Sequence, residues 1–458
     1  MTKKIPDALV IVFGILVLIT IMTWLIPSGT FDRTSVGSRS DVVIAGSYHK
    51  TDAMPQGIWE MLQAPFKGFT EASKIIAFVL LVGGAFSLVM STGAIDAALL
   101  SLIRTSGRSK NRKIIMLSAL IFLFSLCGFT FGMSEESLVF ILFTIPMARS
   151  MGYDTIVGVA IPFVSSGIGG AAAAYNPFSV GVAMEIAGLP FPSGVQERSI
   201  IWLVLTLCVI VFVVMYANRI EKNPQKSFLY NLPSIEIKER STGPFDLKKI
   251  VVILIFLATL VVIPFGSKDW DWGVIEIGAA FLAMGLMSVA VMRFNSTKII
   301  TEFTDGAKGM LTAALVIGLS RSVLVIARDG QIIDTILFHL ANSIEGLPST
   351  LSIQLMFIVQ GIINFFIPSG SGQAAITMPV MAPLADLTGI SRQSAVMAFQ
   401  LAAGFFDLII PTSGVTMGVL SLAGIPYQLW LKWIWKLMLM LIVIAMVSLA
   451  ILVNIDFV

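Results

Sequence analysis

The chain has 458 residues, of which 56% are hydrophobic and only 12% are charged, and its net charge is +3. Soluble domains usually carry about 25% charged residues, so a chain with a mean hydropathy of +0.91 cannot bury its apolar side chains in one water-soluble core. This composition excludes a cytosolic enzyme, a secreted disulfide-rich domain and a nucleic-acid-binding protein, and it indicates a polytopic membrane protein. The two cysteines lie in apolar runs, so no disulfide framework is expected.

The first apolar run, residues 8–26, is 19 residues long and follows Lys3 and Lys4. It is long enough to span the bilayer and lacks a small-residue cleavage site, so we expect a retained first helix with a cytoplasmic N-terminus. The polar stretch that follows, residues 27–57, predicts an external loop. Residues 57–70 then predict an amphipathic helix that lies along the membrane, and residues 297–309 predict a weaker one.

Two pairs of neighbouring apolar runs predict re-entrant hairpins, over residues 114–149 and 351–387. The second run of each pair has only 12 or 14 residues, which is short for about 30 Å of hydrocarbon. Each of these short runs also follows a polar tip that contains glycine, Gly132-Met-Ser-Glu-Glu-Ser137 in the first hairpin and Pro368-Ser-Gly-Ser-Gly-Gln373 in the second.

Residues 155–187 and 391–423 each form an apolar run of 33 residues, which as a straight helix would be about 50 Å long. Both runs contain helix breakers, so we expect two helices that are interrupted at membrane depth. The expected hinge and backbone positions in the breaks and in the second tip are Gly167, Gly169, Gly170, Pro177, Gly370, Gly372, Pro411 and Gly414.

The order of hairpin and broken helix occurs twice, which predicts an internal repeat. A constant offset of 237 residues pairs Phe66 with Phe303, Ser134 with Ser371, Pro146 with Pro383 and Gly152 with Gly389. We therefore expect a first repeat over residues 1–218, a cytoplasmic linker and connecting span over residues 219–272, and a second repeat over residues 273–458.

The distribution of basic residues predicts the orientation of the two repeats. Nine spans and two hairpins place 20 of the 30 Lys and Arg residues inside and nine outside, with Arg198 among the outer ones and Arg321 alone in the bilayer. The connecting span inverts the second repeat, so the first hairpin opens to the cytoplasm, and the second hairpin and the C-terminus lie outside. Inverted repeats with discontinuous helices are the architecture of secondary transporters, with the site at the repeat interface.

Two tips and two breaks leave backbone groups without helical partners, which is tolerated at membrane depth only where protein or a watery cavity satisfies them. We expect these four segments to meet in one substrate-binding site. Its candidate side chains are Ser134, Glu135, Glu136, Ser137, Tyr175, Asn176, Arg321, Ser369, Ser371, Gln373, Asp407, Thr412 and Ser413. The coupling ion would be a proton, or Na+ held near Ser134, Asn176, Ser371 and Thr412; no metal cofactor is expected.

Three acids among these candidates, Glu135, Glu136 and Asp407, favour a cationic ligand or a proton or Na+ site, because buried charges are costly and by default functional. In the alternative reading the two glutamates lie at a watery rim and only cap the helix that begins at Ser137. Arg321 either forms a structural ion pair with Asp407 or a tip glutamate, or it receives a substrate carboxylate.

Enzymatic and ATP-driven functions find no support in the motifs. Ser369-Gly-Ser-Gly372 resembles a serine-hydrolase elbow only loosely, no histidine is placed to activate it, and no metalloprotease or nucleotide-binding motif is present. The tryptophans Trp430, Trp433 and Trp435 predict a belt at the membrane interface.

Four motifs resemble the YfcC family, a branch of the anaerobic C4-dicarboxylate carrier-like group within the ion transporter superfamily. They are Trp24-Leu-Ile-Pro-Ser-Gly-Thr-Phe-Asp-Arg33, Gly132-Met-Ser-Glu-Glu-Ser137, Tyr175-Asn-Pro-Phe178, and Phe405-Phe-Asp-Leu408 with Pro411-Thr-Ser-Gly414. The resemblance spans essentially the whole chain. It implies an all-α fold similar to the divalent anion/sodium symporters, with a scaffold and a transport domain that moves as an elevator, usually in a homodimer of the bacterial inner membrane.

Relatives in this family include proposed antiporters of arginine and ornithine, and others are named for C4-dicarboxylates. The Glu-Glu tip departs from the Ser-Asn-Thr tips of the dicarboxylate/sodium symporters and suits a guanidinium or ammonium group. The leading hypothesis is therefore exchange of a cationic or zwitterionic amino acid. The alternatives are a Na+- or H+-coupled carrier of dicarboxylates or other organic anions, a carrier of peptide or amide-type substrates, and a membrane-embedded sensor or assembly partner.

Overall fold

The computed structural model describes residues 8–36, 39–95, 97–98, 110–230, 232, 246–270, 272–455 and 457. The elements of the first half are α1 (Ala8–Leu25), β1 (Gly29–Thr30), β2 (Arg33–Val36), β3 (Arg39–Val43), β4 (His49–Lys50), α2 (Ile58–Glu71), α3 (Ser73–Ser91), α5 (Lys110–Phe131), α6 (Ser137–Ser150), α7 (Thr155–Val159), η1 (Ala160–Val164), α8 (Ser165–Ala171), η2 (Pro177–Gly181), α9 (Val182–Ala187), α10 (Val195–Lys222) and η3 (Pro224–Lys226).

The remaining elements are α11 (Leu247–Asp269), α12 (Val274–Met292), α13 (Ser296–Gly309), α14 (Leu311–Asp329), α15 (Ile332–Asn342), α16 (Ser349–Phe366), α17 (Gly370–Leu387), α18 (Arg392–Phe406), α19 (Gly414–Leu422) and α20 (Tyr427–Asn454). Lys3, Lys4 and part of the predicted cytoplasmic linker, residues 233–245, lie outside the described residues.

Eight helices of the described part are long and apolar enough to cross a membrane, namely α1, α3, α5, α10, α12, α14, α16 and α20. This confirms the prediction of a multi-pass helical membrane protein. Two of the eight, α5 and α16, are the first limbs of the predicted hairpins, and each is followed by a short tip and a second helix, α6 or α17.

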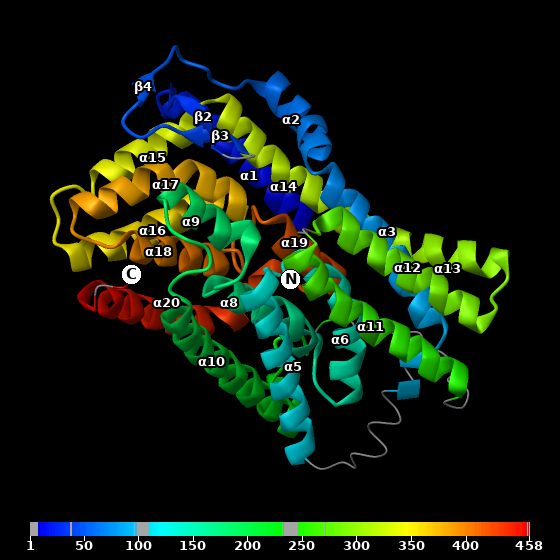
Figure 1. Ribbon diagram of the computed structural model, residues 1–458. Helices are drawn as coiled ribbons and strands as arrows, with labels where there is room; N and C mark the ends of the chain where they lie inside the picture. The colour runs from blue at the N-terminus through cyan, green and yellow to red at the C-terminus, as the bar shows by residue number, and fades with distance from the viewer. Residues whose placement is uncertain are drawn as a thin grey trace.

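The helices of the two halves follow the same order with closely matched lengths. The helices α2 and α13 both have 14 residues, α3 and α14 both have 19, and α10 and α20 both have 28. The packing is reciprocal, because α2 lies on α14 of the other half while α13 lies on α3. Figure 1 shows α3, α12 and α13 side by side on one side of the molecule, with α8 and α19 near the centre.

The predicted external loop contains strands, which the all-α expectation did not include. The strand β1 pairs with β4, and β2 pairs with β3, both antiparallel. The loop is anchored on α15, where Asp334 Oδ2 accepts hydrogen bonds from Phe31 N at 3.0 Å and from Arg33 Nη2 at 2.7 Å. Since Asp334 is only 4% exposed, the anchor is buried and holds the loop against the helices.

One prediction about side chains at the helix ends is wrong, and a second side chain has an unexpected environment. Trp430 and Trp433 do not form an interface belt, because they are 0% and 2% exposed and stack on each other with ring centroids 5.0 Å apart. Arg198, which was counted among the outer basic residues, has a completely buried side chain near the start of α10. Trp435 alone of the three tryptophans is exposed, at 53%. Helix packing, which a hydropathy profile does not contain, decides these positions.

Candidate functional site

The first tip joins α5 to α6 through Gly132, which has a φ of +76° and lies directly against Asn176. A Cβ at this position would lie 2.2 Å from the Asn176 Nδ2 atom, so only glycine permits the contact. The buried Glu136 folds back and accepts a hydrogen bond from the backbone N–H of Ser134 at 3.1 Å. The next residue, Ser137, is fully buried and shares a hydrogen bond with Ser166 Oγ at 3.0 Å.

The second tip joins α16 to α17 and begins the second limb earlier than the hydropathy profile predicted, at Gly370. Ser369 is the N-cap, and its side chain accepts a hydrogen bond from Gly372 N at 3.4 Å. Gln373 therefore lies inside the helix, fully buried, where it bonds to Asn364 at 3.0 Å and to Gln360 at 2.8 Å.

The first broken helix stops at the end of α8 and resumes at η2 with Asn176 as its N-cap. The Asn176 side-chain oxygen accepts hydrogen bonds from Phe178 N at 2.8 Å and Ser179 N at 3.3 Å, so it satisfies the free N–H groups of the new helix end. Gln400 of α18 reaches across to this break, where its amide nitrogen donates to Gly170 O at 2.5 Å and to Ser179 Oγ at 2.9 Å.

The second broken helix stops after α18 and resumes at α19 with Ser413 as its N-cap. The side chain of Thr412 donates to Phe365 O in α16 at 2.6 Å, and Thr416 donates to the Asp407 carbonyl. The Thr412 bond joins the second break to the second hairpin. Asp407 itself lies at the point where α18 ends.

Two of the three glycines predicted in the first break, Gly167 and Gly169, are close-contact positions. Gly167, Gly169 and Gly170 all lie within α8, before the break. A Cβ at Gly169 would lie only 1.9 Å from Ser125 O, because α8 packs directly on α5. A Cβ at Gly404 of α18 would likewise lie 2.4 Å from the Ala171 Cβ, so the two broken helices cross next to their breaks.

Each break also receives a side-chain donor from the long helix that follows it. Arg198 Nη1 of α10 donates to Ala173 O at 3.2 Å, and its Nη2 donates to Gln393 at 3.2 Å. Trp430 Nε1 of α20 donates to Leu408 O at 2.9 Å. These bonds pair carbonyls that the interrupted helices no longer use, which explains why both side chains are buried.

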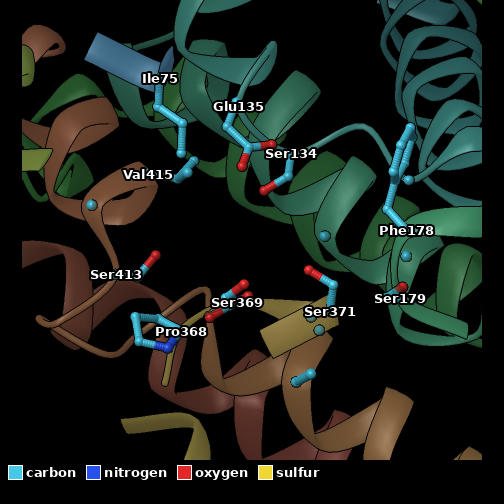
Figure 2. Close-up of a pocket in the computed structure, with 18 of the residues that line it drawn as sticks. Ile75, Ser134, Glu135, Phe178, Ser179, Pro368, Ser369, Ser371, Ser413 and Val415 are labelled. Carbon is cyan, nitrogen blue, oxygen red and sulfur yellow. The ribbon is translucent and has the colours of Figure 1, made fainter. Parts of the chain in front are cut away.

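The tips and breaks surround a cavity of about 410 Å³. Figure 2 shows the side chains of Ser134 and Glu135 on one side of this space and those of Ser369 and Ser371 on the opposite side. The predicted positions that line it are Ser134, Glu135, Gly167, Gly170, Asn176, Arg321, Ser369, Gly370, Ser371, Asp407, Thr412, Ser413 and Gly414.

The remaining predicted positions do not line the cavity, and they are Glu136, Ser137, Gly169, Tyr175, Pro177, Gly372, Gln373 and Pro411. The polar members are occupied elsewhere, since Glu136, Ser137 and Gln373 are buried in the hydrogen bonds described above. Tyr175 is 40% exposed and packs edge-on against Phe129. The lining is made of consecutive stretches, residues 132–135, 368–371 and 412–415, and in both tips the residues that follow the lining stretch turn into the next helix and away from the shared space.

Several lining residues were missed by the sequence analysis, among them Glu71, Ser166, Ser179, Ser320 and Gln400. They lie in regular helices or helix starts without an unusual local pattern, so no sequence signal distinguished them. Glu71 also changes the reading of Arg321, whose Nε donates to Glu71 Oε2 at 3.1 Å. Its ion-pair partner is therefore Glu71 of α2, and not Asp407 or a tip glutamate.

Within the described ranges, the cavity lining contains buried acceptors that have no donor. The charged lining residues are the acids Glu71, Glu135 and Asp407 and the base Arg321. Buried side-chain atoms without a hydrogen-bond partner include Asp407 Oδ1 and Gln400 Oε1. The amide orientation of Gln400 follows from its contact with the Gly170 carbonyl, which requires the nitrogen on that side. A ligand that offers N–H groups would satisfy both acceptors, as buried polar groups require.

The helix starts at the cavity provide the opposite polarity. Ser369, Ser413 and Asn176 each cap the N-terminus of a helix segment there. Helix N-termini carry partial positive charge and free N–H groups, which favour an anionic group. The cavity therefore offers acceptors for a cation and helix N-termini for an anion within one space.

The chain matches the family model described as "C4-dicarboxylate anaerobic carrier" over residues 5–454. It belongs to this family. The carrier is also 35% identical over 471 aligned residues to the Escherichia coli (strain K12) protein named "Putative basic amino acid antiporter YfcC", with 93% of this chain and 92% of that protein covered. The resemblance predicted from the four motifs is thus confirmed, and the chain is a multi-pass membrane transporter by family.

A second relative is an uncharacterized protein of Haemophilus influenzae (strain ATCC 51907 / DSM 11121 / KW20 / Rd), 27% identical over 502 aligned residues, covering 99% of this carrier and 98% of that protein. Two solved structures are similar at 15% identity. The YdaH transporter of Alcanivorax borkumensis has a TM-score of 0.45, with 98% of this chain and 99% of that chain covered. MtrF of Neisseria gonorrhoeae, described as illuminating a class of antimetabolite efflux pumps, has a TM-score of 0.44, with 98% and 95% covered.

Proposed function

We propose that this carrier is a secondary active transporter of the bacterial inner membrane that exchanges a cationic or zwitterionic amino acid of the arginine or ornithine kind. The observation that carries the proposal is the pair of unpartnered acceptors in the cavity, Asp407 Oδ1 and Gln400 Oε1. Together with Glu135 they form a set that suits the N–H groups of a guanidinium or ammonium ion.

The other end of an amino acid carries a carboxylate, and the cavity offers groups for it. The free N–H groups at the starts of α17 and α19 and the hydroxyls of Ser369, Ser371 and Ser413 are suited to bind an anion. Arg321 lies on the same cavity and supplies a positive side chain. A bipolar substrate fits this lining better than a simple dianion does, because three acids face one base.

We further propose that residues 1–218 and 273–458 are inverted repeats, joined by a linker and connecting span over 219–272. The proposal is supported by the matched helix lengths and by the reciprocal packing of α2 on α14 and α13 on α3. Within it, α5–α6 and α16–α17 are re-entrant hairpins that move with the broken helices as an elevator, in a homodimer. The reciprocal contacts of α6 with α19 and of α17 with α9 support one moving unit.

Counterflow in proteoliposomes tests the substrate. Purified carrier is reconstituted with ornithine, a neutral amino acid or succinate inside, and uptake of labelled arginine is followed with and without Na+ and a pH gradient. We expect arginine uptake to be driven by internal ornithine and not by internal succinate. Dependence on Na+ or on the pH gradient would identify the coupling ion, and independence from both would indicate pure exchange.

A C4-dicarboxylate is the second candidate, favoured by the helix N-termini at the cavity and by Arg321. In that case the acids of the cavity would bind Na+ or H+ rather than substrate. Labelled succinate in the same liposomes distinguishes the two candidates. Succinate counterflow that is unaffected by excess arginine, with no arginine uptake, would overturn the amino-acid proposal and leave the transporter fold intact.

A further inference from the structure

A chain of alternating charges connects α2 and α14 at the edge of the cavity. Lys67 pairs with Asp329 at 2.7 Å, and Arg328 pairs with Asp329 at 3.7 Å and with Glu71 at 2.5 Å. Glu71 then pairs with Arg321 at 3.1 Å. Of these five residues only Glu71 and Arg321 line the cavity, so the chain of charges ends at the cavity wall.

Arg321 has free donors at this end of the chain. Its Nε donates to Glu71, and within the part of the chain that the structure describes its terminal nitrogens Nη1 and Nη2 have no hydrogen-bond partner. The side chain is 36% exposed. A guanidinium whose two terminal nitrogens are free is the group that binds a carboxylate in a bidentate fork.

Glu71 is held firmly enough to orient this guanidinium. Its two carboxylate oxygens are used separately, Oε1 by Arg328 and Oε2 by Arg321. Burial acts to raise the pKa of Glu71, but the hydrogen bonds and charges of Arg328 and Arg321 outweigh it and keep the pKa below its ordinary value. Glu71 is therefore ionised at neutral pH and remains bonded to Arg321 through Nε alone.

Arg321 also lies close to the second break. Ile317 is one helical turn earlier in α14, and a Cβ on Gly414, the first residue of α19, would lie 3.1 Å from the Ile317 Cα. One turn of helix rises about 5.4 Å, so the Arg321 Cα lies about one turn beyond this contact, and Arg321 and Gly414 line the same cavity. A carboxylate bound by Arg321 would thus lie near a helix N-terminus that favours the same charge.

We propose that Arg321 binds the substrate's α-carboxylate through its two terminal nitrogens and that Glu71 is the positioning residue that aims it. This inference rests on the proposed function, because it names the group that recognises one end of that substrate. It makes Arg321 the residue that separates amino acids from amines of the same shape. The acids Glu135 and Asp407 bind the other end in both kinds of compound.

The test compares arginine with agmatine, which has the same guanidinium but no carboxylate. Uptake of both is measured in proteoliposomes for the wild type, Arg321→Gln, Arg321→Lys, Glu71→Gln and Glu71→Asp. The matched control is Lys67→Gln, which removes a charge from the same helix and ion-pair chain but does not line the cavity. Thermal unfolding in detergent shows whether each variant folds.

We expect kcat/KM for arginine to fall about tenfold in Arg321→Gln while that for agmatine changes little, since one charge-assisted bidentate contact is lost. Arg321→Lys should lose much of the same preference, because it keeps the charge without the fork. Glu71→Gln should lower the arginine preference less, and Glu71→Asp, which keeps the charge, should retain more of it than Glu71→Gln. Lys67→Gln should match the wild type.

An unchanged ratio of arginine to agmatine in a folded Arg321→Gln variant overturns the inference while leaving the proposed function in place. If the wild type moves succinate and not arginine, the proposed function fails, and the same variants then test Arg321 against succinate. Unchanged succinate affinity in Arg321→Gln would overturn the carboxylate assignment in that case too. If the wild type moves neither compound, both proposals are overturned.

Discussion

The two helix breaks have the same construction but use different chemistry. In each half the fourth residue of the long helix that follows donates a side-chain N–H to a carbonyl just after the first limb. Arg198 of α10 bonds to Ala173 O at 3.2 Å, and Trp430 of α20 bonds to Leu408 O at 2.9 Å. One donor is a buried cation and the other is a neutral indole, although both are 0% exposed.

The difference teaches that the architecture requires a donor at this place and leaves its chemical type open. A carbonyl released by a broken helix must find a partner when it is buried. Any rigid N–H donor of sufficient reach satisfies it, so the two halves can match in structure where they differ in sequence. Other hydrogen bonds then decide which residue type is used. A guanidinium has further N–H donors that an indole lacks, and Arg198 donates one of them to Gln393.

The acidic groups of the two halves also occupy different places. Apart from Glu71, which is paired with Arg321 and Arg328, the first half carries its cavity acid in the hairpin tip, at Glu135, and has Asn176 at its break. The second half carries its acid at the break, at Asp407, and has a neutral tip with Ser369 and Ser371. Besides Glu71, the cavity therefore receives one carboxylate from each half, from segments that do not correspond to each other.

Asp407 should show the largest effect if the second break provides the main cation-binding group. Asp407→Asn removes the charge at a carboxylate with an unpartnered buried oxygen and should lower arginine exchange about 100-fold. Asp386→Asn is the matched control, because Asp386 is exposed and paired with Arg392 away from the cavity. Full exchange by a folded Asp407→Asn variant would contradict the assignment and remove the distinction between the two breaks.

The two break donors should differ in their effect on stability. Trp430→Phe leaves Leu408 O without its indole donor and should cost about 1–3 kcal/mol of unfolding free energy. Arg198→Met loses comparable bonds, but it also removes a buried charge whose desolvation is expensive, so the net loss should be smaller. Thermal unfolding of both variants in one detergent checks this order. A larger loss of unfolding free energy in Arg198→Met would mean that the Arg198 guanidinium stabilises its break more than the Trp430 indole stabilises the other.

The two tip glutamates should differ although they are neighbours. Glu135 lines the cavity, and Glu135→Gln should lower arginine kcat/KM about tenfold. Glu136 does not line it and accepts the Ser134 N–H, which an amide oxygen can also accept, so Glu136→Gln should change uptake less than about twofold. Equal losses in both variants would show that the tip acts as one charged unit.

Much of the fold could be predicted because it depends on local composition. Long apolar runs, polar glycine-containing tips and breakers inside long runs marked the spans, the tips at Gly132 and Pro368 and the two interruptions. The roles of single residues could not be predicted in the same way. Glycines such as Gly169 were read as hinges, although they mark where one helix presses on another. A glycine that interrupts a helix and a glycine that permits close helix packing are the same residue in the sequence. Only their neighbours in the folded structure distinguish them.

The candidate site likewise combines features set by the local sequence with features set by tertiary contacts. The sequence by itself determined the membrane class, the family and the polar tips and breaks that meet at the cavity, because hydrophobic length and backbone breakage are local properties. Only the tertiary structure decided which side chains face the cavity. Gln400 and Glu71 reach it from helices outside the predicted tips and breaks or away from their polar positions, and Glu136 turns away from it. The rotation of each helix about its axis is set by contacts between the two halves, which no single segment encodes.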